Sequence, residues 1–114
     1  MPHFVIDCSK NIIEDVEPDE ILNQVFETAF GTGLFKAADI KVRINPYDHY
    51  RVGNGKDDFI HIFANIMEGR NTAQKKDLSE KIVFELKQMF PDVPIISINI
   101  RDFEKATYCN RSMI

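Results

Sequence analysis

Hydrophobic and polar residues follow two different periods along the first half of this chain. Residues 2–8 form a short apolar run that is typical of a strand. In residues 17–30 the apolar positions recur at helical spacing, and residues 39–45 alternate between apolar and polar side chains, as in a strand with one solvated face. The helical stripe consists of Ile21, Leu22, Val25, Phe26, Ala29 and Phe30. The pattern therefore predicts a strand, a helix and a second strand.

The second half of the chain has the same order of periods. Residues 59–67 and 94–100 are apolar runs of strand length, and residues 77–90 carry a second helical stripe. Between the two halves, Asn54-Gly55 within residues 51–58 predicts a hairpin turn, because these residue types adopt the positive φ angles that such turns require. The second stripe consists of Leu78, Ile82, Val83, Leu86, Met89 and Phe90.

A constant shift of 58 residues relates the two halves, since it takes His3 to His61. We interpret residues 2–45 and 59–103 as pseudo-repeats within a single domain that spans residues 1–114. Right-handed β-α-β crossovers place both helices on the same face of one sheet. The predicted fold is thus α+β, with duplicated β-α-β units forming a four-stranded sheet with two helices on one face. The uncovered face of such a sheet favours oligomerisation.

The composition narrows the classes of function. The chain has 114 residues, of which 44% are hydrophobic, and its net charge of −4 argues against a nucleic-acid surface. No apolar segment approaches the roughly 20 residues that cross a bilayer, and Asp7 interrupts the opening apolar run before it reaches the length of a secretory signal. The cysteines, Cys8 and Cys109, favour a reducing compartment. We therefore expect a soluble, cytoplasmic protein that binds neither nucleic acid nor membranes.

Few residue patterns point to side-chain chemistry. The sequence contains no Gly-x-Gly-x-x-Gly loop, no metal-type spacing of cysteine and histidine, and no Gly-x-Ser-x-Gly elbow. We interpret His3, His49 and His61 as structural, hydrogen-bonded histidines, and Cys8 as a small buried strand residue. We predict no metal site, and the remaining candidates are the amino terminus and the basic residues.

Pro2 is an unusual second residue, because proline lacks a backbone donor and is tolerated only at the first position of a strand or at a sheet edge. Removal of the initiator methionine, which is efficient before a small second residue, would leave proline with a free secondary amine. An α-amino group titrates near ~7.7–8.0, and burial beside cations lowers its pKa. Pro2 is therefore a candidate general base near neutral pH. The alternative is that it merely begins a strand.

Three basic residues are candidates for binding an anion. Lys41 and Arg43 share the polar face of the second predicted strand, and Arg70 precedes Asn71, a predicted helix N-cap. In the predicted sheet the first strands of the two units run antiparallel at the centre, so Pro2 lies beside Arg70. A base and a carboxylate-binding guanidinium then meet within one chain. The alternative is that these cations are solvated surface residues.

The chain resembles the 5-carboxymethyl-2-hydroxymuconate isomerase family of the tautomerase superfamily in three stretches, MPHFVIDCS, GLFKAADIKVRI and EGRNTAQKK, which match in order over most of its length. It is also similar, in IMEGRNTAQKKDLSEKI, to the start of 4-oxalocrotonate tautomerase, a half-length relative built from one β-α-β unit. The resemblance implies duplicated β-α-β units, a homotrimer formed through the sheets, no cofactor, and an amino-terminal proline as the catalytic base.

The resemblance also implies roles for individual residues. Pro2 would take the proton from the 2-hydroxyl group of a 2-hydroxydienoate dicarboxylate and return it to carbon, which gives the 2-oxo isomer. Arg70, Arg43 and Lys41 would bind the substrate carboxylates and favour the charge that develops at the 2-oxo oxygen. The C-terminal tail would wall the pocket, which makes Tyr108 a candidate substrate contact.

Lys41 departs from the family pattern, which has arginine at both polar positions of this strand, as Arg-x-Arg. Lysine keeps the charge but lacks the planar fork that grips a carboxylate through two bonds. The sequence therefore predicts the proton chemistry more firmly than the identity of the substrate. Another amino-terminal-proline activity, such as a different tautomerase, a dehalogenase or a hydratase, stays open as an alternative. So does a non-catalytic tautomerase-like oligomer in which Pro2 only begins a strand.

Overall fold

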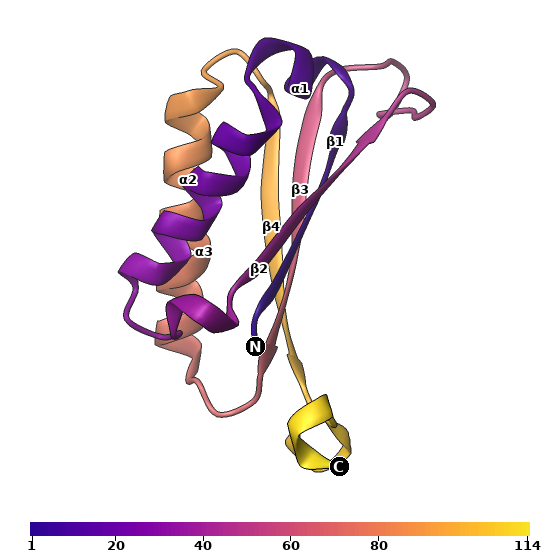
Figure 1. Cartoon of the computed structure of the whole chain (residues 1–114). Coiled ribbons are helices and arrows are strands. Elements are labelled where there is room, and N and C mark those ends of the chain that lie inside the picture. The colour runs from indigo at the N-terminus through magenta and orange to yellow at the C-terminus, as the bar shows by residue number, and fades with distance from the viewer.

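A four-stranded sheet carries the helices on one of its faces (Figure 1). A computed structural model describes all 114 residues of the chain. The order of strand, helix and strand that was predicted for each half is confirmed. The strands are β1 (His3–Ser9), β2 (Lys41–Tyr47), β3 (Phe59–Met67) and β4 (Ile95–Phe103), the helices are α1 (Asn11–Asp15), α2 (Pro18–Gly31) and α3 (Thr72–Met89), and the 3₁₀ turns are η1 (Ala37–Asp39), η2 (Lys105–Thr107) and η3 (Arg111–Met113).

The strand order in the sheet is β2-β1-β3-β4. Strand β1 pairs in parallel with β2, which places His3 opposite Lys41, and antiparallel with β3, which places His3 opposite Asn65. Strand β3 in turn pairs in parallel with β4. Because β1 and β3 are antiparallel neighbours, the start of β1 lies at the same end of the sheet as the end of β3. The predicted topology is therefore confirmed.

Alternate side chains of the strands face the helices and form the core. The predicted helical stripes are confirmed at their centres, but Phe30, which was also predicted to face inward, is 46% exposed. Phe30 lies about 100° around the helix from Ala29 and stacks on Phe26 at 6.2 Å between ring centres, on the flank of α2. The completely buried core residues include Phe4, Ile6, Ile21, Ala29, Ile60, Ile62, Ile66 and Leu78.

The two helices do not correspond at the predicted shift of 58 residues. Their buried positions match at a shift of 57, which takes Ile21 to Leu78 and Val25 to Ile82. The constant shift is therefore wrong for the helices, because packing against the sheet, and not residue identity, sets which helix positions are buried. The duplication of the two units stays a prediction.

Helix α3 begins at Thr72, directly after the predicted N-cap Asn71 and before the apolar stripe of residues 77–90. The Asn71 side chain accepts a hydrogen bond of 2.8 Å from the Gln74 backbone N–H, and the Gln74 side chain accepts one of 2.9 Å from the Asn71 N–H. This capping box confirms Asn71 as the N-cap. The first helical turn is polar and largely exposed, so its sequence carries no apolar period from which to extend the helix. The cap fixes the backbone immediately after Arg70.

The connection between β2 and β3 contains a tight turn, shifted by one residue from the prediction. Val52 and Gly55 exchange backbone hydrogen bonds of 3.0 and 2.9 Å, so the central residues are Gly53 and Asn54. Gly53 has the positive φ of 54° that the turn requires. The turn does not join neighbouring strands, since β1 lies between β2 and β3.

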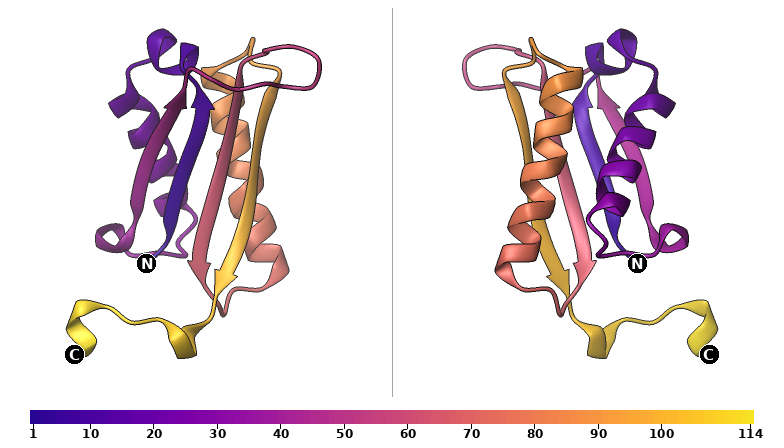
Figure 2. Two further views of the ribbon diagram at one scale, coloured as in Figure 1. Left: turned by 90° about the vertical axis from the view of Figure 1, so that its right-hand side faces the viewer. Right: turned by 90° about the vertical axis from the view of Figure 1, so that its left-hand side faces the viewer.

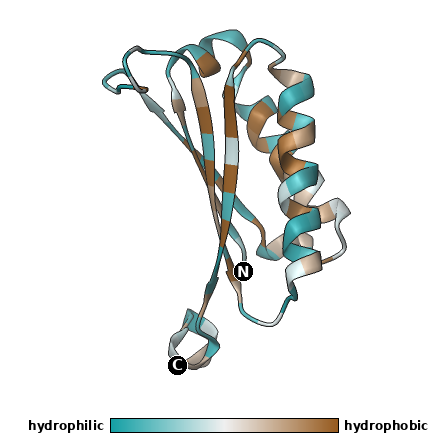
Figure 3. Cartoon of the chain, turned by 180° about the vertical axis from the view of Figure 1, so that it is seen from behind, coloured by the Kyte–Doolittle hydropathy of each residue, from teal (hydrophilic) through white to brown (hydrophobic).

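The face of the sheet opposite the helices is uncovered in the single chain (Figure 2). Hydrophobic and hydrophilic residues alternate along the strands (Figure 3), and this face is of mixed character. Phe63, which is 40% exposed, shares it with polar residues such as Arg43 and Asn99. The tail of residues 104–114 extends past the end of the sheet where β1 begins (Figure 1). None of the helices combines the length and the apolar character that crossing a membrane demands.

Candidate active site

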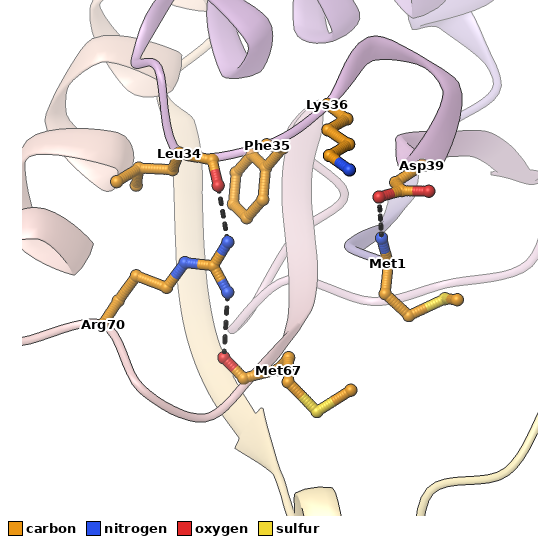
Figure 4. Close-up of a pocket in the computed structure, with 7 residues that line it drawn as sticks. All are labelled: Met1, Leu34, Phe35, Lys36, Asp39, Met67 and Arg70. Carbon is orange, nitrogen blue, oxygen red and sulfur yellow. Dashed lines mark hydrogen bonds and ion pairs between the residues drawn. The ribbon is translucent and has the colours of Figure 1, made fainter.

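A cavity of about 300 Å³ opens at the end of the sheet where β1 begins (Figure 4). Its walls come from the amino terminus, from the loop between α2 and β2, and from the loop after β3. The amino terminus, through Met1, and Arg70 therefore line the same cavity, whereas Pro2 itself does not line it. The residues that line the cavity are Met1, Leu34, Phe35, Lys36, Asp39, Met67 and Arg70.

Backbone carbonyl groups hold the guanidinium group of Arg70. It donates hydrogen bonds to the carbonyl oxygens of Leu34 and Met67, the second at 3.5 Å, and it lies 5.0 Å from the centre of the Phe35 ring. These contacts join the loop after α2 to the end of β3. The remaining N–H donors of the guanidinium group stay free to bind a carboxylate.

The terminal amine lies between charges of both signs. The nitrogen of Met1 is 3.7 Å from Oδ2 of Asp39. Nζ of Lys41 donates to the backbone carbonyl of Asp39 at 2.8 Å and lies 3.7 Å from Sδ of Met1. Pro2 is buried, and its carbonyl oxygen accepts a hydrogen bond of 3.1 Å from the Lys41 N–H. The pairing of β1 with β2 thus fixes Pro2 while Met1 reaches into the cavity.

This environment lowers the pKa of the Met1 amino group below its ordinary range. Burial makes the largest contribution, because it disfavours the charged form of an amine. The cations Lys41 and Arg70 add to the decrease, whereas Asp39 opposes it. An amine at this position therefore holds more of its neutral, basic form at neutral pH than an exposed terminus does.

Arg43 and Tyr108 line a different hollow, of about 430 Å³, on the uncovered face of the sheet. Nη1 of Arg43 lies 3.1 Å from Nδ1 of His3, which lines the same hollow. Burial lowers the pKa of His3, and the positive charges of Arg43 and Lys41 lower it further. The single chain therefore brings Lys41 and Arg70 to the amino terminus but leaves Arg43 and Tyr108 in a separate hollow.

The structure confirms some of the residues that were predicted to have a structural role, but not all of them. His61 lies 2.7 Å from Oγ of Ser97 through Nδ1 and 2.7 Å from Oδ1 of Asn99 through Nε2, so its hydrogen-bonded role is confirmed. Cys8 is completely buried, and burial raises the pKa of its thiol to about 12, which keeps it protonated. His49 is exposed in the loop after β2, which does not match the predicted structural role. No group of three or more His, Cys, Asp and Glu side chains is arranged to hold a metal ion.

Asp39, Lys36 and Phe35 line the cavity but were not predicted as site residues. Asp39 is predicted only as the first residue of a strand, and the residues around it give no indication that it lies near the amino terminus. The topology does contain a signal. In a parallel β-α-β unit the loop that enters the second strand lies at the same end of the sheet as the start of the first strand. The whole loop before β2 must therefore lie near Pro2.

Comparison with known proteins shows the family to which the chain belongs. The family model described as 5-carboxymethyl-2-hydroxymuconate isomerase matches residues 2–114 of the chain. The chain belongs to this family. It is 32% identical over 88 residues to the 5-carboxymethyl-2-hydroxymuconate Delta-isomerase of Escherichia coli, and the match covers 75% of this chain and 69% of that protein. The sequence comparisons therefore place the chain among isomerases.

Solved structures share the fold at lower sequence identity. A 5-carboxymethyl-2-hydroxymuconate isomerase from Deinococcus radiodurans R1 has a TM-score of 0.84 at 21% identity, covering 96% of this chain and 88% of that one. A fused 4-OT protein, described as an asymmetric trimer, has a TM-score of 0.78 at 14% identity, covering 96% and 92%. This member of the isomerase family therefore has the α+β tautomerase fold, as predicted.

The charges around the amine predict opposite effects of two substitutions. We expect Asp39→Asn to lower the pKa of the terminal amine and Lys41→Met to raise it, because the first removes a nearby anion and the second a nearby cation. NMR titration of the α-amino group in isotopically labelled protein measures both changes. Arg51→Met, in the loop at the opposite end of the sheet, is the control and should leave the amine unchanged. Changes of the same sign in both cavity variants would contradict the arrangement.

Proposed function

We propose that this protein is a keto–enol isomerase that converts 5-carboxymethyl-2-hydroxymuconate, or a similar 2-hydroxydienoate, to its 2-oxo isomer. The observation that carries the proposal is the placement of the chain's terminal amine in one cavity with Arg70 and beside Lys41. Membership of the 5-carboxymethyl-2-hydroxymuconate isomerase family supports the same class of substrate.

Pro2 is the proposed general base, acting once Met1 has been removed. Its secondary amine takes the proton of the 2-hydroxyl group and delivers it to a carbon of the diene. The O–H bond breaks, a C–H bond forms, and the double bonds shift so that the enol becomes a ketone. The reaction neither gains nor loses electrons, so its balance requires no redox cofactor. Burial and the nearby cations lower the pKa of the Met1 amine, and the same surroundings would act on the amine of the adjacent, buried Pro2, which supports the assignment.

Arg70 and Lys41 are proposed to bind the substrate at its reacting end, which is the end that carries the 2-hydroxyl group. There they would bind the carboxylate and stabilise the negative charge that develops at the 2-oxygen. Donors that are already fixed where charge develops often supply the largest part of a rate enhancement. The backbone bonds of Arg70 support such a role, because they hold the guanidinium group in place. Arg43 and Tyr108 are proposed to contact the substrate from the second hollow, on the other side of His3.

The proposed assembly is a homotrimer formed through the uncovered faces of the sheets, in the cytoplasm. The uncovered face, on which Phe63 is 40% exposed, supports an interface, because β1–β2 and β3–β4 pair in parallel and parallel sheets usually have both faces covered. The fused 4-OT neighbour is an oligomer with the same fold. Cys8 and Cys109 are both free thiols, which suits a reducing compartment.

Removal of Met1 is expected to switch the activity on. Protein that begins at Pro2 should ketonise 5-carboxymethyl-2-hydroxymuconate, whereas protein that retains Met1 should be inactive, because the proline nitrogen is then an amide with no basic lone pair. Intact-mass measurement identifies the terminus of each preparation, and the decay of dienol absorbance measures turnover. Full activity with Met1 attached would exclude Pro2 as the base.

Phenylpyruvate is the comparison substrate for the same two preparations. We expect the form that begins at Pro2 to prefer 5-carboxymethyl-2-hydroxymuconate, since the cavity holds cations for more than one carboxylate. A preference for phenylpyruvate would favour a different amino-terminal-proline tautomerase. Inactivity of both forms on both substrates would favour the non-catalytic oligomer.

Arg70→Ala is expected to reduce turnover much more than stability. The loss of one charge-assisted carboxylate contact should lower kcat/KM by about 10–100-fold, whereas the lost contacts to backbone carbonyls should reduce the free energy of unfolding by only about 1 kcal/mol. Steady-state kinetics and urea unfolding at one protein concentration measure the two effects. Arg51→Ala, at the far end of the sheet, should change neither. Wild-type kinetics in a folded Arg70→Ala variant would remove Arg70 from the site.

The homotrimer is tested by the mass of the protein in solution. Light scattering should give a mass about three times that of the 13.2 kDa chain. Phe63→Asp, which places a charge on the uncovered sheet face, should shift the mass toward the single chain. Gln88→Asp, on the exposed side of α3, is the matched control and should leave the mass unchanged. A single-chain mass for the unmodified protein would overturn the proposed assembly.

A further inference from the structure

We infer that Lys36 binds the third carboxylate of the substrate and thereby selects for a substrate with a carboxymethyl arm. The inference rests on the proposed function and names a determinant of specificity within the same cavity. The name 5-carboxymethyl-2-hydroxymuconate describes a molecule with three carboxylates, two at the ends of the muconate chain and one on the arm. Arg70 and Lys41 are assigned to the reacting end, and Arg43 contacts the substrate from the second hollow, which leaves one of the three carboxylates without a cation.

The cavity matches the distribution of charge on such a substrate. Arg70 and Lys36 line it from different segments, the loop after β3 and the loop before β2, and Figure 4 shows the Phe35 ring against the guanidinium group of Arg70. A planar diene has an apolar centre with charged groups around it, and Leu34 and Met67 give the cavity apolar walls for such a centre. A diene held in the cavity would therefore meet cations from two separate segments of its wall. This arrangement suits a polycarboxylate better than an acid with a single charge.

The backbone of Lys36 is fixed on both sides, although its side chain is exposed. Its carbonyl oxygen accepts a hydrogen bond of 3.0 Å from the Asp39 N–H, which closes the η1 turn. On the other side, Phe35 is 9% exposed, and its ring packs edge-on against Phe4 at 6.1 Å between ring centres. Binding a carboxylate therefore orders only the lysine side chain, which keeps the entropic cost low.

Lys36 is the cation of the cavity that has no partner within the chain. It takes part in none of the five ion pairs and makes no side-chain hydrogen bond. In the chain that retains Met1, the carboxylate in the cavity lining, Asp39, is paired with the terminal amine and forms no ion pair with Lys36. Arg70 and Lys41 both donate to backbone carbonyl oxygens. A carboxylate ligand would give Lys36 the counter-charge that the protein does not supply.

The test compares two substrates that differ only in the carboxymethyl arm. We expect Lys36→Met to lower kcat/KM for 5-carboxymethyl-2-hydroxymuconate by about tenfold, mainly through KM, because one charge-assisted contact is lost. Turnover of 2-hydroxymuconate, which lacks the arm, should stay at the wild-type value. Lys36→Arg should restore most of the loss, since it keeps the charge. Lys87→Met, at the far end of α3, should alter neither substrate.

A binding measurement gives a readout that does not depend on turnover. By calorimetry the wild-type protein should bind propane-1,2,3-tricarboxylate more tightly than pentanedioate, and Lys36→Met should remove most of this difference. Equal losses on both substrates, or no loss on either, would overturn the role of Lys36. If the wild-type protein turns over neither muconate, the proposed function fails, and calorimetry then shows separately whether Lys36 distinguishes three carboxylates from two.

Discussion

Strands β1 and β3 run antiparallel as direct neighbours at the centre of the sheet, with Phe4 opposite Ala64. Both residues are buried beneath the helices, so the register is tied to the core. A slip of one residue would turn every side chain of β1 to the opposite face, which makes this register strongly specified. The same pairing carries the amino terminus to the end of β3, where the capped start of α3 holds Arg70. The place of the site is thus a consequence of how the core packs.

The cavity surrounds the amino terminus of the main chain with charges of both signs. Burial and the cations Lys41 and Arg70 disfavour the protonated Met1 amine, whereas Asp39, at 3.7 Å, favours it. The same burial and cations would act on the amine of Pro2 after removal of Met1, which is the base that we propose. The backbone bonds of Arg70 also join the loop before β2 to the end of β3, and so link two walls of the cavity.

The alternation of residues 39–45 correctly predicted that Lys41 and Arg43 share one face of β2, since that face follows from a period of two. It did not predict that Lys41 would lie against the side chain of Met1 while Arg43 would contact His3. One step of two residues along a strand covers about 6–7 Å, which is enough to move a side chain from one hollow to another. A sequence can therefore predict which side chains lie on the same face of a strand. Whether they line the same pocket depends on the loops and tail that pack at the end of the sheet.

By itself, the sequence determined the strand and helix order, the N-cap at Asn71, and the end of the sheet at which the amino terminus and Arg70 both lie. These follow from local period, capping chemistry and the handedness of β-α-β units. Only the tertiary structure decided that Asp39 and Lys36 line the cavity, and that Phe30 lies on the surface. Those outcomes depend on how a loop folds back over the start of β1 and on which helix face meets the sheet. Both are set by contacts between residues far apart in the chain, which no local pattern records.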